Sequence, residues 1–116
     1  MSKNKLTKTN LKILPLRPYP GYVIVTRNRK AYERAAKELF GVEDKIINQY
    51  GRFQGGSTWW HPYTYVLWYS SPETLAHELA HVIFAIFDTV GIDPRAGGEE
   101  PFCYMLSQLI LETNSK

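Results

Sequence analysis

Two histidines and a glutamate in one short segment are the residues whose types and spacing best suit chemistry. The segment reads His77-Glu78-Leu79-Ala80-His81, with the two imidazoles four residues apart. In a helix this spacing places them about 40° apart in azimuth and one turn apart along the axis, where both can bind one ion. Neutral imidazole is a good zinc ligand. Glu78 would lie about 100° further round, where the glutamate of an HExxH motif acts as general base on water.

A catalytic zinc ion also needs a third protein ligand and one open position. Glu99 and Glu100 begin a predicted helix after a loop with Pro and Gly that turns the chain back toward the histidines. We favour Glu100 as the third ligand, because Tyr104 and Ser107 continue a polar stripe from it at i+4 and i+7. Glu99 is the alternative.

The remaining candidate ligands are weaker. Asp88 shares the face of His81 but would lie about 10 Å further along the axis, and Asp93 falls in the following loop. His61 precedes a proline and is expected to occupy a turn. An oxyanion would need a hydrogen-bond donor, which a tyrosine hydroxyl can supply. The tyrosines considered for this role are Tyr63, Tyr65 and Tyr104, and Tyr104 is the catalytic candidate that we carry forward.

The helix that carries the motif is predicted to run from Ser71 to Gly91. Ser71-Pro72-Glu73 combines a hydroxyl N-cap, a proline at the first helical position and an acid in the first turn. Apolar residues occupy most of the circumference, so we expect burial on nearly all sides. The two histidines and the glutamate would then need a metal or polar partners to offset their desolvation. Histidines that are only hydrogen-bonded in a core are the alternative.

The elements around this helix predict an α+β fold. Residues 22–25 read as a strand, and Asn28 is a suitable N-cap for a helix over residues 31–40. The aromatic segment 51–70 indicates two or three short strands. A last helix is predicted over residues 99–111. We therefore expect a small antiparallel or mixed sheet packed on the HExxH helix, with one helix before it and the ligand-bearing helix after it.

Length and charge suggest one domain with a basic leader. At 116 residues the chain suffices for a single core. Residues 1–20 are polar, basic and rich in proline, so we expect a flexible leader there and a minimal zincin-like domain over residues 21–116. The net charge of +3 arises largely within the first 30 residues. Without a helix-turn-helix or zinc-finger spacing, a solvated arm is favoured over a nucleic-acid-binding one.

The single cysteine, Cys103, excludes an internal disulfide and suits a reducing compartment. No apolar run in the sequence approaches the length of a secretory signal or a membrane span. We therefore expect a cytoplasmic protein that does not enter a membrane.

From Leu75 to Leu109 the sequence resembles the gluzincins, zinc peptidases in which a glutamate on a later helix completes the HExxH site. The chain is similar in size to their smallest members, the minigluzincins, and it also resembles small HExxH proteins encoded by bacteriophages and prophages. The resemblance implies zinc on His77, His81 and Glu100, with Glu78 as base and proton shuttle. It also implies a peptide or protein substrate and, for a phage protein, a place in the host cytoplasm.

These observations predict a zinc metallopeptidase that cleaves peptide bonds through a zinc-activated water. The first alternative is a catalytically inactive binding or accessory protein that zinc stabilises, because a chain this small gains much from a metal. A nucleic-acid-associated accessory protein that uses the basic leader is the second alternative.

Overall fold

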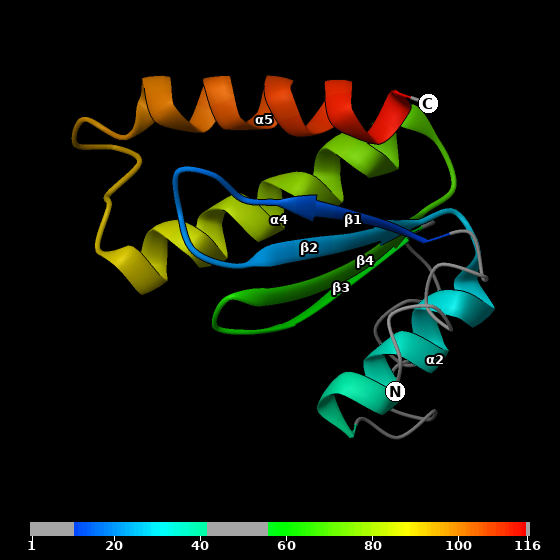
Figure 1. Cartoon of the computed structure of the whole chain (residues 1–116). Coiled ribbons are helices and arrows are strands. Elements are labelled where there is room, and N and C mark those ends of the chain that lie inside the picture. The colour runs from blue at the N-terminus through cyan, green and yellow to red at the C-terminus, as the bar shows by residue number, and fades with distance from the viewer. Residues whose placement is uncertain (1–10, 42–55, 116) are drawn as a thin grey trace.

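The computed structural model describes residues 11–41 and 56–115, which form the predicted α+β fold (Figure 1). Four strands and three helices follow one another along the described chain. They are β1 (Lys12–Pro15), β2 (Tyr22–Thr26), α2 (Arg29–Phe40), β3 (Gly56–His61), β4 (Thr64–Tyr69), α4 (Pro72–Val90) and α5 (Glu99–Asn114).

The four strands form one mixed sheet in the order β1-β2-β4-β3. The pair β1 and β2 is antiparallel, as is the pair β3 and β4, in which Thr58 lies opposite Leu67. Strands β2 and β4 are parallel, with Ile24 opposite Val66. A parallel pair needs a crossover, and here the chain passes through α2 and β3 before it returns in β4. Strand β3, which carries part of the site, is therefore an edge strand.

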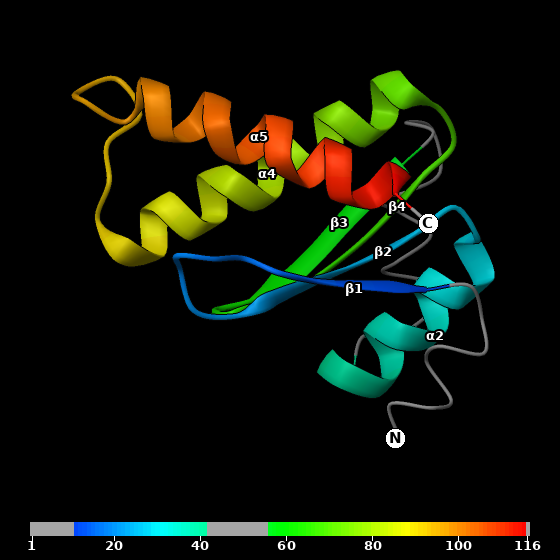
Figure 2. The same ribbon diagram turned by 45° about the horizontal axis from the view of Figure 1, so that its top comes forward.

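Helices cover both faces of the sheet (Figures 1 and 2): α4 and α5 lie on one face and α2 on the other. Side chains of one strand alternate between the two cores, because successive Cβ atoms point to opposite faces. Val23 and Val25 of β2 join the core under α4 and α5, whereas Ile24 joins the core under α2. Strand β4 is buried on both faces in the same way through Tyr65, Val66, Leu67 and Trp68.

The helix ends agree with the predicted caps. The side chain of Asn28 accepts a hydrogen bond from the backbone N–H of Ala31 at 3.1 Å, so α2 begins at Arg29 rather than at Ala31. Ser71 and Thr74 form a reciprocal capping box at the start of α4. The last helix ends at Asn114, beyond the predicted residue 111.

The predicted leader extends too far into the chain. Residues 12–15 form β1, and Leu14 and Leu16 are buried in the core under α4 and α5. The Nζ atom of Lys12 donates to the backbone oxygens of Glu112 and Thr113 at the end of α5, at 3.2 and 2.8 Å. Pro15 ends β1, and Pro18 and Pro20 lie in the turn that follows. Because of its contacts with α5, Lys12 is not part of a solvated arm. Residues 1–10 lie outside the described residues.

The expectation that α4 is buried on nearly all sides is wrong. The sheet and α5 cover part of its circumference, and a stripe at helical spacing remains exposed. The stripe consists of His77, His81, Phe84 and Asp88. None of the described helices combines the length and apolarity that crossing a membrane requires.

Candidate active site

The two motif histidines form a close pair on the exposed stripe of α4. Their Nε2 atoms lie 3.2 Å apart, and the ring centroids are 4.8 Å apart with an interplanar angle of 81°. The side chain of His77 is 62% exposed, so both solvent and a substrate could reach the pair. The predicted spacing on one helix face is confirmed, but these histidines do not bear the desolvation cost expected of a buried pair.

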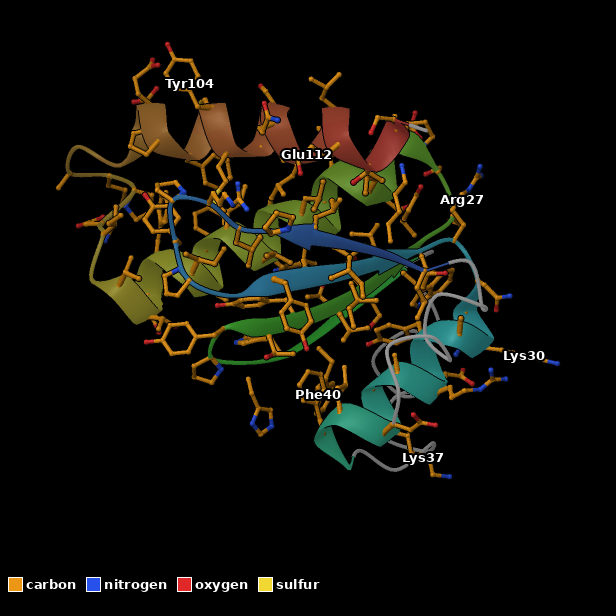
Figure 3. All side chains as sticks on the ribbon, in the orientation of Figure 1. Arg27, Lys30, Lys37, Phe40, Tyr104 and Glu112 are labelled. Atoms are coloured by element: carbon orange, nitrogen blue, oxygen red, sulfur yellow. The ribbon has the colours of Figure 1, made fainter. Side chains whose placement is uncertain are left out.

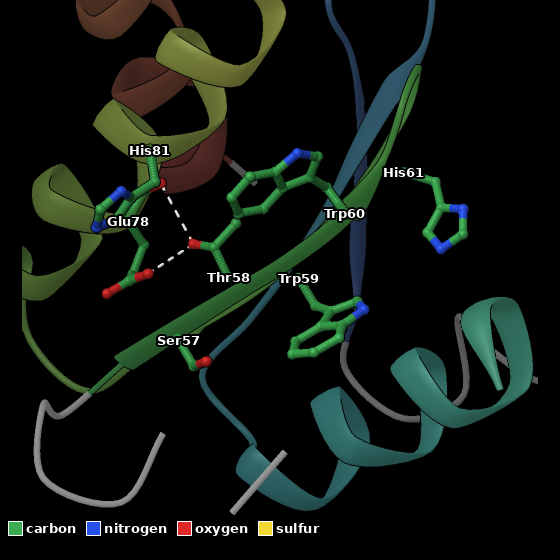
Figure 4. A pocket seen from close by; sticks show the side chains of 7 residues that line it. All are labelled: Ser57, Thr58, Trp59, Trp60, His61, Glu78 and His81. Atoms are coloured by element: carbon green, nitrogen blue, oxygen red, sulfur yellow. Dashed lines mark hydrogen bonds between the residues drawn. The ribbon is translucent and has the colours of Figure 1, made fainter. Parts of the chain in front are cut away.

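Glu78 lies between the histidine pair and strand β3 and is only 2% exposed. The hydroxyl of Thr58 donates to its Oε1 at 2.5 Å (Figure 4). Its second oxygen, Oε2, is buried and has no hydrogen-bond partner among the described residues. This oxygen lies 4.0 Å from Nε2 of His77. A buried carboxylate oxygen without a donor is rare in proteins, so its position beside the imidazoles needs a chemical explanation.

A cleft of about 450 Å³ opens beside Glu78 and His81 along the edge strand β3. In Figure 4, Thr58 and Trp60 lie on the side of β3 that faces α4, whereas Trp59 and His61 lie toward α2. Trp60 is 45% exposed, although an indole of this size usually packs inside a protein. The complete lining consists of Ser57, Thr58, Trp59, Trp60, His61, Glu78 and His81. The cleft thus combines an aromatic wall with the polar groups of the motif.

A second polar contact lies under the cleft, between α2 and β3. The hydroxyl groups of Tyr32 and Ser57 are 3.0 Å apart, and both residues are buried. Burial raises the pKa of Tyr32 to about 12, the hydrogen bond with Ser57 opposes the rise, and the charges of Glu78 and Glu33 add to it. The tyrosine therefore remains protonated at neutral pH.

The histidine pair fits two corners of a zinc site. With Zn–N bonds of about 2.0 to 2.1 Å, two nitrogens of a tetrahedral shell should lie about 3.3 to 3.4 Å apart. The observed separation of 3.2 Å is close to this value. The orphaned Oε2 of Glu78 faces the same place and would be satisfied by a polar or cationic partner there. The same nitrogen separation also permits a hydrogen bond between the two rings.

The structure does not bring Glu100 to the histidine pair. Across residues 11–41 and 56–115, no group of three or more His, Cys, Asp or Glu side chains could hold a metal. Helix α5 runs back along α4, and Phe102 contacts Phe84 at 4.9 Å and Phe87 at 6.3 Å between ring centroids. From this register Glu100 lies on the order of 10 Å along the axis from His81, toward the C-terminal end of α4. Glu99, the alternative ligand, is exposed in the same turn.

Tyr104 also lies away from the pair. It is 73% exposed and projects from the outer side of α5 (Figure 3), and it does not line the cleft. The polar stripe from Glu100 through Tyr104 thus faces solvent, because the apolar face of α5 turns toward α4. His61 is the last residue of β3 and pairs with Thr64, so it precedes the turn at residues 62–63 and does not occupy it as expected. Its ring stacks on Phe40, with ring centroids 5.0 Å apart.

Three residues near Glu78 are not indicated by the motif: Gly56, Ser57 and Thr58. They occupy successive positions on β3, and only the pairing of this strand brings them beneath α4. Their sole sequence signal is a run of small and hydroxyl residues in front of two tryptophans. This run shows no periodic pattern from which its contact with α4, more than a dozen residues further along the chain, could be predicted.

The chain was compared with protein-family models, with curated proteins and with solved structures, and none of the three comparisons found a match. The interpretation of the site therefore depends on its geometry.

Proposed function

We propose that this chain is a zinc-dependent hydrolase of peptide bonds, in which His77 and His81 hold the ion and Glu78 is the general base. One observation carries the proposal. The Oε2 atom of Glu78 is buried, has no hydrogen-bond partner among the described residues and lies 4.0 Å from Nε2 of His77. This nitrogen and Nε2 of His81 are 3.2 Å apart, close to the separation of two nitrogen ligands around a tetrahedral zinc ion. A hydrogen bond between the two exposed histidines would explain the pair but not the orphaned carboxylate oxygen beside it.

The residues of the site have distinct roles in this proposal. A bound zinc ion supplies Lewis acidity, which makes water a stronger nucleophile near neutral pH. Glu78 accepts a proton from the attacking water through Oε2, because Oε1 is already bonded to Thr58. The same carboxyl group then donates the proton to the leaving amine. The protein fold around Glu78 excludes bulk water from this carboxylate, which strengthens its electrostatic interactions.

The cleft supports an extended peptide as the substrate. Strand β3 is an edge strand, and no described strand pairs with its outer side. An extended peptide could add to that edge through main-chain hydrogen bonds, with alternate side chains directed into the cleft. The exposed indole of Trp60 would then contact an apolar side chain of the substrate next to His81.

One observation favours a second candidate function, the inactive zinc-binding accessory protein. A catalytic zinc site normally has three protein ligands, and the described residues supply no such group. A site with two histidines could still bind zinc and contribute to stability without turnover.

Glu78→Gln separates the two functions. If the chain is a peptidase, kcat should fall roughly 10²- to 10⁴-fold while zinc binding, measured by titration and elemental analysis, persists. His81→Ala should lose both zinc and peptide cleavage, whereas His61→Ala, a histidine outside the pair, should keep zinc. Zinc retained by His81→Ala would exclude the assigned ligands, and an inactive wild-type protein with bound zinc would favour the accessory role.

We also place the protein in the cytoplasm. Cys103 is exposed and is the only cysteine of the chain, so no internal disulfide can form. We expect it to remain a free thiol in a reducing compartment.

A further inference from the structure

Strand β3 is attached to helices on both of its faces through consecutive hydroxyl residues. Ser57 points toward α2 and lies 3.0 Å from the hydroxyl of Tyr32. Thr58, the next residue, points toward α4 and donates to Glu78 (Figure 4). The alternation of a β-strand permits this arrangement, because neighbouring side chains leave opposite faces. The position of Thr58 is therefore held from below by the buried Tyr32–Ser57 pair.

The contact between Thr58 and Glu78 selects one carboxylate oxygen. The threonine hydroxyl lies 2.5 Å from Oε1 and 3.4 Å from the backbone oxygen of Glu78. A hydroxyl group has one proton to donate, so the shorter contact to the charged oxygen is the dominant hydrogen bond. With Oε1 held in this way, Oε2 is directed to the side where it lies 4.0 Å from Nε2 of His77.

Gly56 makes this close approach possible. A Cβ atom at this position would lie 3.1 Å from Cγ and 3.3 Å from Oε2 of Glu78. It would also lie 2.9 Å from the backbone oxygen of Trp68 on the paired strand. Any larger residue would displace either the strand or the glutamate. The segment Gly56-Ser57-Thr58 thus provides space, an anchor and a hydrogen-bond donor in that order.

We infer that Thr58 is the positioning residue of this site: its hydroxyl holds the Glu78 carboxylate so that Oε2 faces the histidine pair. The inference deepens the proposed function and rests on it for its catalytic consequence. The orientation of the carboxylate itself does not depend on whether the protein turns over a substrate. Thr58 also lines the cleft. Its hydroxyl bonds to Glu78 and to neither histidine in the described structure, so its effect on the base passes through Glu78.

Thr58→Val tests the inference, with Thr58→Ser as the matched control. Valine keeps the shape of threonine but removes the donor, whereas serine keeps the donor. The first readout is the ¹³Cδ NMR signal of Glu78 in the full-length protein without metal. We expect one narrow line in the wild type and in Thr58→Ser. In Thr58→Val the line should shift and broaden, because the carboxylate then samples more than one orientation.

The second readout is the kinetics of peptide cleavage by the zinc-loaded protein. Thr58→Val should lower kcat roughly ten- to a hundredfold with KM changed less than about twofold, since misplacing a base affects the chemical step. Thr58→Ser should restore most of kcat. Binding of Zn²⁺ alone should be equal in all three proteins, because His77 and His81 are unchanged.

The outcomes separate this inference from the proposed function. An inactive wild-type protein would contradict the peptidase proposal, and the NMR signal would then decide the positioning role alone. An unchanged Glu78 signal in Thr58→Val, or a loss of kcat in Thr58→Ser as large as in Thr58→Val, would overturn the inference. If Thr58→Val does not fold, Thr58→Ala provides the donor-free variant with less bulk in the cleft.

Discussion

The hydroxyl groups of Tyr32 and Ser57 lie 3.0 Å apart in the interior between α2 and β3, and the tyrosine is fully buried. This contact connects the helix on one face of the sheet to the strand that carries Thr58. It belongs to no motif, yet it lies directly under the candidate base. Because this tyrosine is buried, the stability of the protein should depend on pH in the alkaline range.

Protein stability should fall as the pH rises above 10. Burial raises the pKa of Tyr32 to about 12 in the folded protein, whereas the unfolded chain has the ordinary value of 10.0. The folded state therefore retains a proton that the unfolded state loses. The contribution is fully present below pH 10 and is lost as the pH rises toward 12. At about pH 11 it should have lowered the free energy of unfolding by about 1.4 kcal/mol.

Urea denaturation at about pH 9 and pH 11 measures this effect. Tyr32→Phe is the matched variant, because phenylalanine retains the ring and removes the titrating group. Its free energy of unfolding should fall less over the interval than that of the wild type. Tyr65, whose pKa burial also raises, titrates in both proteins and cancels from the comparison. Equal losses in the two proteins would show that Tyr32 does not contribute.

Gly56→Ala should destabilise the protein and disturb Glu78. The added Cβ would lie 2.9 Å from the backbone oxygen of Trp68, so the paired strands would have to separate locally. Overpacking of this kind typically costs about 1 to 3 kcal/mol. Chemical denaturation gives the loss of stability, and the Glu78 ¹³Cδ signal reports the displacement of the side chain.

A second glycine provides the control for this substitution. Gly41 has a positive φ of 67°, and a Cβ atom added there would meet no heavy atom of the described residues within 4 Å. Asparagine tolerates that backbone conformation, so Gly41→Asn should change the free energy of unfolding by less than about 0.5 kcal/mol. A Gly56→Ala protein as stable as Gly41→Asn would contradict the tight packing of β3 against α4.

Lys12→Met should lower the free energy of unfolding by about 1 kcal/mol. The lysine ammonium donates to the final carbonyl groups of α5, and its positive charge is stabilised by the negative end of the helix dipole. Thermal denaturation measures the change. Lys30→Met is the control, since Lys30 is exposed in the first turn of α2, where a cation is not favoured. Equal stability of Lys12→Met and the wild type would show that the contact between Lys12 and the end of α5 does not stabilise the protein.

Much of the local structure follows from the sequence alone. The structure confirms the predicted caps at Asn28 and Ser71 and the predicted strands of the aromatic segment. These features could be predicted because they depend on neighbours within a few residues. The spacing of His77 and His81 likewise places both rings on one helix face without reference to the rest of the fold.

Other features depend on contacts between distant segments. The prolines at positions 15, 18 and 20 favour a leader that includes residues 12–15, but pairing with β2 makes a strand of this segment. The face of α4 that carries the histidines is exposed because α5 and the sheet cover only the other sides. The spacing of apolar residues along a helix does not show which of its faces will pack against other elements.

The sequence by itself determined an α+β chain with two imidazoles and a carboxylate on one helix, because secondary structure and helix-face spacing are short-range properties. Only the tertiary structure decided that Glu78 turns inward to Thr58 while the histidines face solvent, and that Glu100 lies beyond their reach. These relations depend on how β3 and α5 pack against α4, which is set by long-range burial of apolar surface rather than by the motif.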